Sequence, residues 1–244
     1  MKRRALFLAS PLLAFGSRTW AQAAPDAAAG ARYVALSLVG DELTYVGAAD
    51  GVTGTMHARG AVQAVPMPGA PFDRTVLEVL ASAVPHARPG AALSFLASSA
   101  PEAFAHQDDW FGGGKLTLPP ALHGAVAKEG ASQLLLVTKR RGETGVSDGT
   151  TKFGIGKLTG LGFYIDRNTP MVDPKAGDVR GFIAPYVYVR LSLVDVATFS
   201  VTGQLDLGIA KPYTTLTPQD MMDALQTTLV DGLTDAVARV LKTG

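Results

Sequence analysis

The second half of the chain carries a period-two pattern that constrains the fold more than any other feature. The apolar residues Val187, Val189, Leu191 and Leu193 alternate with Tyr188, Arg190 and Ser192. Because successive side chains of a strand point to opposite faces, this spacing predicts a strand over 186–194 with one face in the core. The stretch 195–200 can turn the chain, and the apolar stretch 201–209 then predicts a returning partner strand.

Three amphipathic segments predict helices over 72–84, 120–129 and 218–242. The first has Asp73 as a candidate cap and Pro85 as a stop, and the last begins with a capping-box sequence, TPQD. In the last segment, apolar residues recur at helical spacing at positions 222, 225, 229, 233, 236, 237 and 240. This helix is therefore expected to lie on a sheet.

Four apolar stretches predict strands in the first half of the chain. The stretch 33–39 is followed by Gly40 and Asp41, so 43–46 is expected to be its hairpin partner. The stretch 92–97 is predicted to be a buried strand, and 133–138 a further one. Together these elements predict an α+β (mixed α/β) fold, a largely antiparallel sheet of five to seven strands with helices packed on it.

The chain shows no linker of low complexity, so 32–244 is predicted to be one domain. Its 47% apolar content can supply a sizeable core.

The N-terminus has the parts of an export signal. Basic residues precede an apolar run over 5–15, and a small-residue site ends at Ala23, so we predict a signal peptide cleaved after Ala23. Residues 24–31 are predicted to be a flexible mature N-terminus. The pair Arg3 and Arg4 is compatible with twin-arginine export, and general secretion is the alternative. The expected location is the periplasm.

Charge and composition exclude several classes of partner and site. The whole chain carries a net charge of +1, and removal of residues 1–23 takes four of its 22 Lys and Arg, leaving 18 basic against 21 acidic residues, or −3. Nucleic acid requires clustered basic residues, so it is not expected as a partner. The short basic cluster 139–141 is interpreted as a solvated turn. The chain has no Cys for a disulfide or a lipid anchor, and no later apolar run long enough for a transmembrane helix.

The glycine-rich segment 153–165 raises the question of a phosphate-binding loop. Bulky apolar residues occupy odd positions, and glycines occupy the even positions Gly154, Gly156, Gly160 and Gly162. Leu158 after Lys157, and Thr159 in place of a third glycine, depart from the known nucleotide motifs. The pattern predicts one strand with a bare face, or two short strands of a hairpin. The bare face either packs inside the domain or binds a partner.

The stretch 180–188 mixes aromatic, aliphatic and basic residues just before the predicted strand. It is either a binding lip or core with a bulge at Pro185. If it is a lip, the candidate interaction surface consists of Gly154, Gly156, Gly160, Gly162, Tyr186, Tyr188 and Arg190.

No residue set has a spacing typical of catalysis or metal binding. The four histidines lie far apart in the sequence, and no serine stands in a Gly-x-Ser-x-Gly motif. The polar cluster 106–110 places carboxylates near an imidazole but is interpreted as an exposed helix end. We therefore predict no catalytic residue, no metal site and no cofactor.

Two stretches resemble the α/β domains of curli-assembly lipoproteins and of the TolB amino-terminal region. The segment 130–137 is similar to their passage of Gly-Ala-Asp followed by an apolar strand, with Ser132 in the acidic position. The segment 189–198 resembles their strand ending in Val-Asp-x-x-Thr-Gly, with Phe199 in place of the Gly. The resemblance implies a non-enzymatic envelope module that docks to other components. The blocks GLGFYID and GFIAPYVYVRLSLVD also resemble uncharacterised exported proteobacterial proteins.

These observations favour an exported, soluble, non-enzymatic cell-envelope protein that acts as an interaction or assembly module with an envelope protein partner. A periplasmic small-ligand or lipid-binding protein is the alternative, and a hydrolase is the second alternative. An interaction module should expose an apolar or aromatic patch, a binder should enclose an apolar cavity, and an enzyme should gather polar groups in a cleft.

Overall fold

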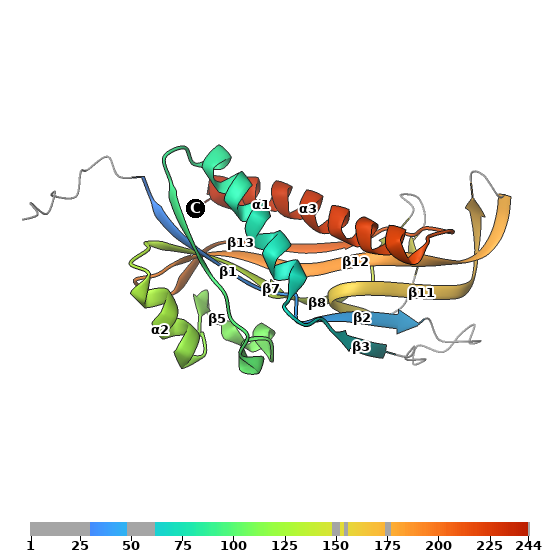
Figure 1. The fold of residues 1–244 in the computed structure, drawn as a ribbon, viewed down its shortest axis with the longest axis horizontal. Helices are drawn as coiled ribbons and strands as arrows, with labels where there is room; N and C mark the ends of the chain where they lie inside the picture. The colour runs from blue at the N-terminus through green and yellow to red at the C-terminus, as the bar shows by residue number, and fades with distance from the viewer. Residues whose placement is uncertain (1–29, 48–61, 148–151, 154–155, 174–176, 244) are drawn as a thin grey trace, which may run out of the picture.

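The chain folds around one large mixed sheet, with two long helices side by side on one of its faces (Figure 1). The computed structural model describes residues 30–47, 62–147, 152–153, 156–173 and 177–243. The helices are α1 (Pro71–Ala87), α2 (Pro120–Lys128) and α3 (Pro218–Thr243). The predicted signal peptide lies outside the described residues.

The main sheet has eleven strands among the described residues. They are β1 (Arg32–Leu38), β2 (Glu42–Gly47), β3 (Val62–Pro66), β4 (Ala92–Leu96), β5 (Phe111–Gly112), β6 (Lys115–Leu116), β7 (Gln133–Lys139), β8 (Arg141–Glu143), β11 (Lys157–Asp173), β12 (Gly177–Asp195) and β13 (Ser200–Ala210). The short strands β9 (Val146–Ser147) and β10 (Lys152–Phe153) pair with each other. The predicted fold class is confirmed, and the strand number exceeds the expected one partly because β5, β6 and β8 are only two or three residues long.

Strand β12 joins the two halves of the sheet. Along one edge it pairs antiparallel with β11 up to Tyr188, and from Val189 onward with β7. Along the other edge it pairs antiparallel with β13 from Tyr186. The pairs β1–β4, β1–β7 and β2–β11 are parallel, so the sheet is mixed but largely antiparallel.

The main core lies between the sheet and the helices α1 and α3. In α3 six of the seven predicted apolar positions are buried, namely Leu225, Leu229, Leu233, Ala236, Val237 and Val240, and Met222 is partly buried. The capping box is confirmed, because Thr217 Oγ1 donates to Asp220 Oδ2 at 2.6 Å and the Asp220 amide donates back to Thr217 Oγ1 at 3.2 Å. Local sequence thus places the helix, and its apolar face positions it on the sheet.

A second core lies on the opposite face, at the β1 end of the sheet. There α2 and the short turns before and after it cover Val34, Leu36, Leu134 and Leu136. With one face of β1 and β7 under α1 and α3 and the other under α2, both strands are buried on both sides. This explains why their sequences are almost continuously apolar.

The predicted hairpin between the first two strands is wrong. Strand β2 pairs with β3 and β11 and not with β1, so the chain continues past Gly40 into the other half of the sheet. The amides of Val39 and Gly40 donate to Asp73 Oδ1 of α1 at 2.8 and 3.2 Å. These contacts hold the corner between β1 and β2 against the helix.

The roles predicted for Asp73 and Pro85 in α1 are also corrected. The residue before the helix is Ala70, which makes no side-chain cap, and Asp73 bonds to the end of β1. Pro85 lies within the last turn, and the helix runs two residues beyond it to Ala87. A proline there removes only one helical hydrogen bond close to the helix end.

The turn after β12 keeps the backbone that a glycine would adopt. Phe199 has a φ of 52°, in the left-handed region. Its ring stacks on His123 of α2 with a centroid distance of 4.3 Å. Phe199 therefore occupies a left-handed turn position that favours glycine, and its ring is held by His123 of α2.

Candidate functional site: the groove between α1 and β4

A groove of about 910 Å³ lies between α1 and the carboxyl end of β4. Its lining is mainly apolar and includes Met67, Leu77, Ala81, Phe95, Ala97 and Phe104. Ligand sites are typically concave and apolar with few polar groups, and they recur at the carboxyl ends of parallel strands. The groove meets these criteria, because β1 and β4 are parallel and end there.

Strand β4 forms one wall of the groove and is an edge of the sheet. It was predicted to be buried, but among the described residues it pairs only with β1. The Ala92 amide donates to the carbonyl of Ala31 at 3.2 Å, so Ala92, Ser94 and Leu96 direct their backbone groups to β1. By alternation, the amide and carbonyl groups of Leu93 and Phe95 point away from the sheet. The outer edge of β4 thus offers backbone groups to a further strand.

Phe95 presents an aromatic ring to the groove. Its register partner on β1 is Ala35, which belongs to the core under α1, so Phe95 lies on the same face as α1. Phe95 is 46% exposed, whereas Leu93 on the same face packs against the core. Phe95 is therefore an apolar side chain that the described part of the chain leaves half uncovered.

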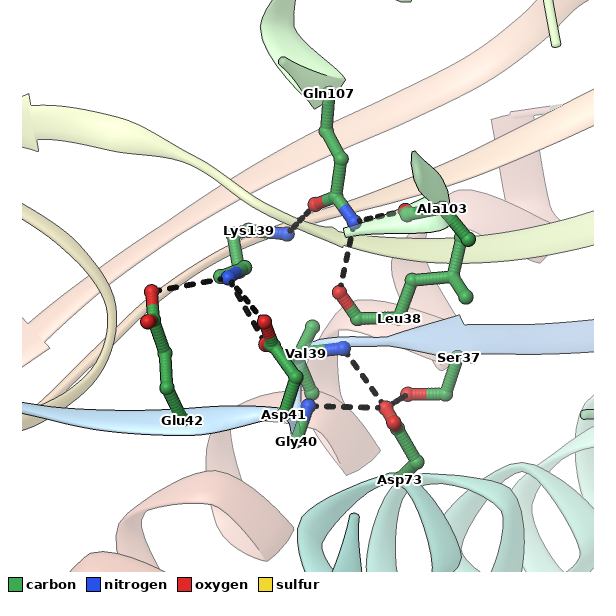
Figure 2. A network of polar contacts seen from close by, with 10 residues as sticks. All are labelled: Ser37, Leu38, Val39, Gly40, Asp41, Glu42, Asp73, Ala103, Gln107 and Lys139. Atoms are coloured by element: carbon green, nitrogen blue, oxygen red, sulfur yellow. Dashed lines mark hydrogen bonds and ion pairs between the residues drawn. The ribbon is translucent and has the colours of Figure 1, made fainter. Parts of the chain in front are cut away.

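Asp73 is one of the carboxylates that line the groove, and Figure 2 shows its contacts. Its Oδ1 accepts three hydrogen bonds, from the Ser37 hydroxyl at 2.6 Å and from the amides of Val39 and Gly40. Burial raises the pKa of Asp73 above its ordinary value, although these three bonds act in the opposite direction. The side chain anchors β1 on α1 and also borders the groove.

A second polar group lies beside Asp73 and fixes the start of β2 (Figure 2). The Lys139 ammonium is 2.9 Å from Asp41 Oδ1 and 3.2 Å from Glu42 Oε1, and its side chain is only 11% exposed. Gln107 donates to the carbonyls of Leu38 and Ala103 and accepts from the Lys139 amide at 2.7 Å. These contacts fix Asp41, which lines the groove.

The basic cluster was interpreted as a solvated turn, and the structure corrects this. Lys139 is paired with the two acidic residues at the start of β2, and Arg140 Nε lies 3.0 Å from Asp206 Oδ2. The acidic partners come from distant segments, so the sequence alone could not reveal these pairs.

The candidate interaction surface is largely inside the protein. Tyr186 is fully buried and Tyr188 is 2% exposed. The Tyr186 hydroxyl donates to the Thr44 carbonyl at 3.2 Å, and the Tyr188 hydroxyl donates to the Glu143 carbonyl at 2.8 Å. Of the two interpretations of 180–188, the buried side chains agree with core and not with an exposed lip, because β12 is central to the sheet and both of its faces are covered here. The expected bulge at Pro185 is absent, since Pro185 pairs in regular register with Phe163 and the register shift lies between Asp166 and Pro170.

Arg190 is also engaged within the domain. Its guanidinium donates to both oxygens of Asp206, at 2.7 and 3.1 Å, and lies over the ring of Phe111. Its side chain is 17% exposed. Hydrogen bonding to Asp206 raises its pKa. Because Arg190 is paired with Asp206, its charge is already neutralised within the domain and is not available to a binding partner.

The glycines of the candidate surface differ from one another. A Cβ at Gly162 would lie 1.9 Å from the Thr44 carbonyl oxygen, so β2 packs directly on this glycine. Gly160 has a φ of +66° and faces the Lys139 side chain, whereas Gly156 has a φ of +108° and faces open space. Gly154 lies outside the described residues. Close packing inside the domain, one of the two interpretations of the bare face, holds for Gly162.

The groove residues escaped the sequence analysis for identifiable reasons. Asp73 was taken for a helix cap, and Phe95 for a core residue of an apolar strand. Asp73 lies in the first turn of its helix, where capping residues also occur, so no local signal showed that it bonds to the end of β1. No local signal identified β4 as an edge.

The described residues contain no group of three or more His, Cys, Asp or Glu side chains placed to hold a metal ion. Among the same residues, no helix is long and apolar enough to cross a membrane. His106 and Asp109, in the polar cluster considered above, are 3.9 Å apart and both highly exposed. The groove is therefore the best-formed candidate site in the described part of the chain.

Comparison with solved structures gives matches of low sequence identity and low TM-score. No protein-family model matches the sequence, and no curated protein matches it. Protein XCC0632 from Xanthomonas campestris, of the DUF330 family, is 13% identical with a TM-score of 0.42, over 88% of this chain and 86% of that one. A putative neuraminyllactose-binding hemagglutinin homolog from Helicobacter pylori is 7% identical with a TM-score of 0.39, over 86% and 84%.

The PelC dodecamer from Paraburkholderia phytofirmans is 10% identical with a TM-score of 0.36, over 86% of this chain and 88% of that one. TM-scores of this size do not establish a shared fold. None of the three is a curli-assembly or TolB protein, so the resemblance noted in the sequence gains no support from them.

Proposed function

We propose that this protein is an exported, non-enzymatic envelope module that binds an extended segment of another envelope protein as an additional strand on β4. The observation that carries the proposal is the outer edge of β4 beside the apolar groove, which no other strand of the described residues pairs with. The export sequence at the N-terminus supports a periplasmic location.

The chemistry of the edge favours a polypeptide over a small molecule. Leu93 and Phe95 direct backbone donors and acceptors outward in the spacing of a strand, and another extended backbone is the group that satisfies such a row. The adjoining groove supplies apolar surface from Leu77, Ala81 and Phe95 for alternate side chains of that segment. Backbone pairing would give affinity, and the groove would give selectivity.

The position of α1 limits how the segment can lie. Helix α1 covers β1 and approaches β4. An added strand would therefore lie beside the β4 edge, with α1 over one of its two faces. An apolar side chain of the segment would pack between Phe95 and Leu77. This geometry resembles recognition modes in which a peptide extends a sheet beside a helix.

The test is a selection of short random peptides on the immobilised mature protein, with the Phe95→Lys variant as counter-selection. We expect the wild type to enrich peptides with an extended, alternating apolar pattern that Phe95→Lys does not retain. Phe95→Lys should fold normally because residue 95 is half exposed. Enrichment of the same peptides by both proteins would contradict a site at the groove.

Backbone pairing is tested separately with N-methylated versions of a recovered peptide. A strand directs alternate amides to its neighbour, so methylation of one alternate set should abolish binding and methylation of the other should be tolerated. Hydrogen exchange should show new protection at the amides of Leu93 and Phe95 in the complex. Equal tolerance of both sets, without protection, would instead indicate a small-ligand type of groove binding and overturn strand addition.

A further inference from the structure

We infer that the segment bound beside β4 carries a basic group, a Lys or Arg side chain or a free amino terminus, that donates to Oδ2 of Asp73. The inference rests on the proposed function and specifies the chemistry of the partner. It follows from how the two oxygens of this carboxylate are used and from the charges around it.

The two oxygens of Asp73 have different environments. All three hydrogen bonds to the carboxylate, from Ser37, Val39 and Gly40, end on Oδ1. Among the described residues no donor reaches Oδ2, and Asp73 belongs to the lining of the groove. The protein therefore fixes the side chain through one oxygen and leaves the other available to an occupant of the groove.

Within the described part of the chain no Lys, Arg or His side chain forms an ion pair with Asp73, and Arg74, which also lines the groove, forms none with it. The nearby Lys139 is already shared by Asp41 and Glu42. The negative charge of Asp41 and the burial of Asp73 both disfavour its ionised form. A half-buried carboxylate with an open oxygen is best complemented by a cation that carries N–H donors, since such charge-assisted bonds are the stronger kind.

Other occupants fit this end of the groove less well. A divalent cation requires several oxygen ligands, and the described residues contain no group of three or more His, Cys, Asp or Glu side chains placed to hold one. An anion at the start of α1 would meet the carboxylate of Asp73, which already lies in the first turn. A basic group of the bound segment is the remaining common chemistry.

The location of Asp73 also determines where along β4 the basic group of the bound segment lies. Leu36 of β1 is in register with Leu96 of β4, and Asp73 contacts the residues directly after Leu36. The basic group therefore lies toward the carboxyl end of β4, beyond the apolar side chain that contacts Phe95. If the group is a free amino terminus, the segment runs antiparallel to β4.

The first part of the experiment compares modified peptides on the wild-type protein. Its result therefore does not depend on whether a protein variant folds. Each recovered peptide is prepared with Lys replaced by norleucine, and separately with an acetylated amino terminus, and binding is measured by fluorescence anisotropy. We expect one of the two changes to weaken binding about 10- to 100-fold, as for a hydrogen bond to a charged group. That change identifies whether a side chain or the terminus supplies the cation.

The protein side of the experiment uses Asp73→Asn, which keeps an oxygen acceptor for the three anchoring donors. This variant should bind the basic peptide as weakly as the wild type binds the neutral one, and the two effects should not add. Glu78→Gln, at an exposed groove residue of the same helix, is the matched control and should change affinity less than about 3-fold.

Two outcomes separate the inference from the proposed function. If basic and neutral peptides bind equally while Phe95→Lys still abolishes binding, the inference about Asp73 is wrong and the groove proposal stands. If the wild type retains no peptide in a Phe95-dependent manner, the proposed function itself is wrong.

Discussion

Strands β12 and β4 are both apolar in sequence but have opposite positions in the sheet. From Tyr186 onward β12 is paired on both edges, and Tyr186, Val187 and Val189 are fully buried. Strand β4 is paired on one edge, and its Phe95 is 46% exposed. Apolar composition therefore identifies a strand without showing whether that strand lies at the centre of a sheet or at its edge.

The difference can be tested by substitutions that should be costly around β12 and nearly neutral on the outer part of β4. Large losses of stability at both strands would show that β4 is covered. Small losses at both would show that the centre of the sheet is loosely packed.

The largest effect is expected for Gly162→Val on β11, opposite Tyr186 of β12. The added Cβ would lie 1.9 Å from the Thr44 carbonyl oxygen and 2.7 Å from the Tyr186 hydroxyl. Overpacking typically costs about 1 to 3 kcal/mol, and a clash with backbone places this variant at about 3 kcal/mol or above. Urea unfolding measures the free energy.

Gly124→Ala in α2 is the control for Gly162→Val. A Cβ at Gly124 meets no atom within 4 Å, so alanine should stabilise the helix by up to about 1 kcal/mol. Wild-type stability of Gly162→Val would contradict the close approach of β2 to β11.

A smaller loss is expected for Tyr188→Phe. The Tyr188 hydroxyl accepts from the Gly145 amide and donates to the Glu143 carbonyl, both at 2.8 Å. Removal of the hydroxyl breaks both bonds and should cost about 1 to 2 kcal/mol. Tyr186→Phe breaks a single bond of 3.2 Å and should cost less. The reverse order in thermal unfolding would show that the β8 segment is not held by Tyr188.

The anchoring role of Asp73 predicts a difference between two substitutions. Asp73→Ala leaves the Ser37 hydroxyl and the amides of Val39 and Gly40 without their acceptor and should cost about 1 to 3 kcal/mol. Asp73→Asn keeps the acceptor and should cost less than about 1 kcal/mol. Equal losses for both would show that the charge, and not the acceptor, holds the β1 corner.

The pH dependence of the same residue has a defined sign. Burial raises the pKa of Asp73 in the folded protein above its ordinary value. The folded state therefore binds the proton more tightly, so the contribution of Asp73 is fully present below about pH 4 and is lost as pH rises through the folded pKa. The stability of the wild type relative to Asp73→Asn should fall over that interval in urea unfolding. A rise there would mean that hydrogen bonding outweighs burial.

The helices and most strands could be predicted because their signals are local. The capping box of α3 and its apolar positions lie within one segment, and the alternation in β12 identifies a strand from a few residues. The pairing of β2 with β11 could not be predicted, because Thr44 and Gly162 are far apart in the chain and only their contact reveals the register. The expected hairpin relied on the turn signal at Gly40, whose amide is bonded to Asp73.

The candidate site was missed for the same physical reason. Asp73 has the sequence position of a helix-capping residue. A carboxylate that bonds to the end of a strand elsewhere in the fold cannot be distinguished from a capping residue by sequence alone. Tyr186 and Tyr188 attracted attention as aromatic residues next to a basic one, but their hydroxyls find backbone partners in other strands. Which polar group meets which depends on tertiary contacts that composition and spacing do not encode.

The smallest effect on stability is expected for Phe95→Ser. The ring is half exposed and belongs to none of the buried clusters of the described residues, so its loss should cost less than about 1 kcal/mol. Leu93→Ser is the matched control, since it lies on the same strand and face but packs against the core, and it should cost about 2 kcal/mol. Phe95→Ser should nevertheless abolish the selective retention of peptides. A loss of stability as large as that of Leu93→Ser would mean that Phe95 is part of the core, and β4 would then no longer contrast with β12.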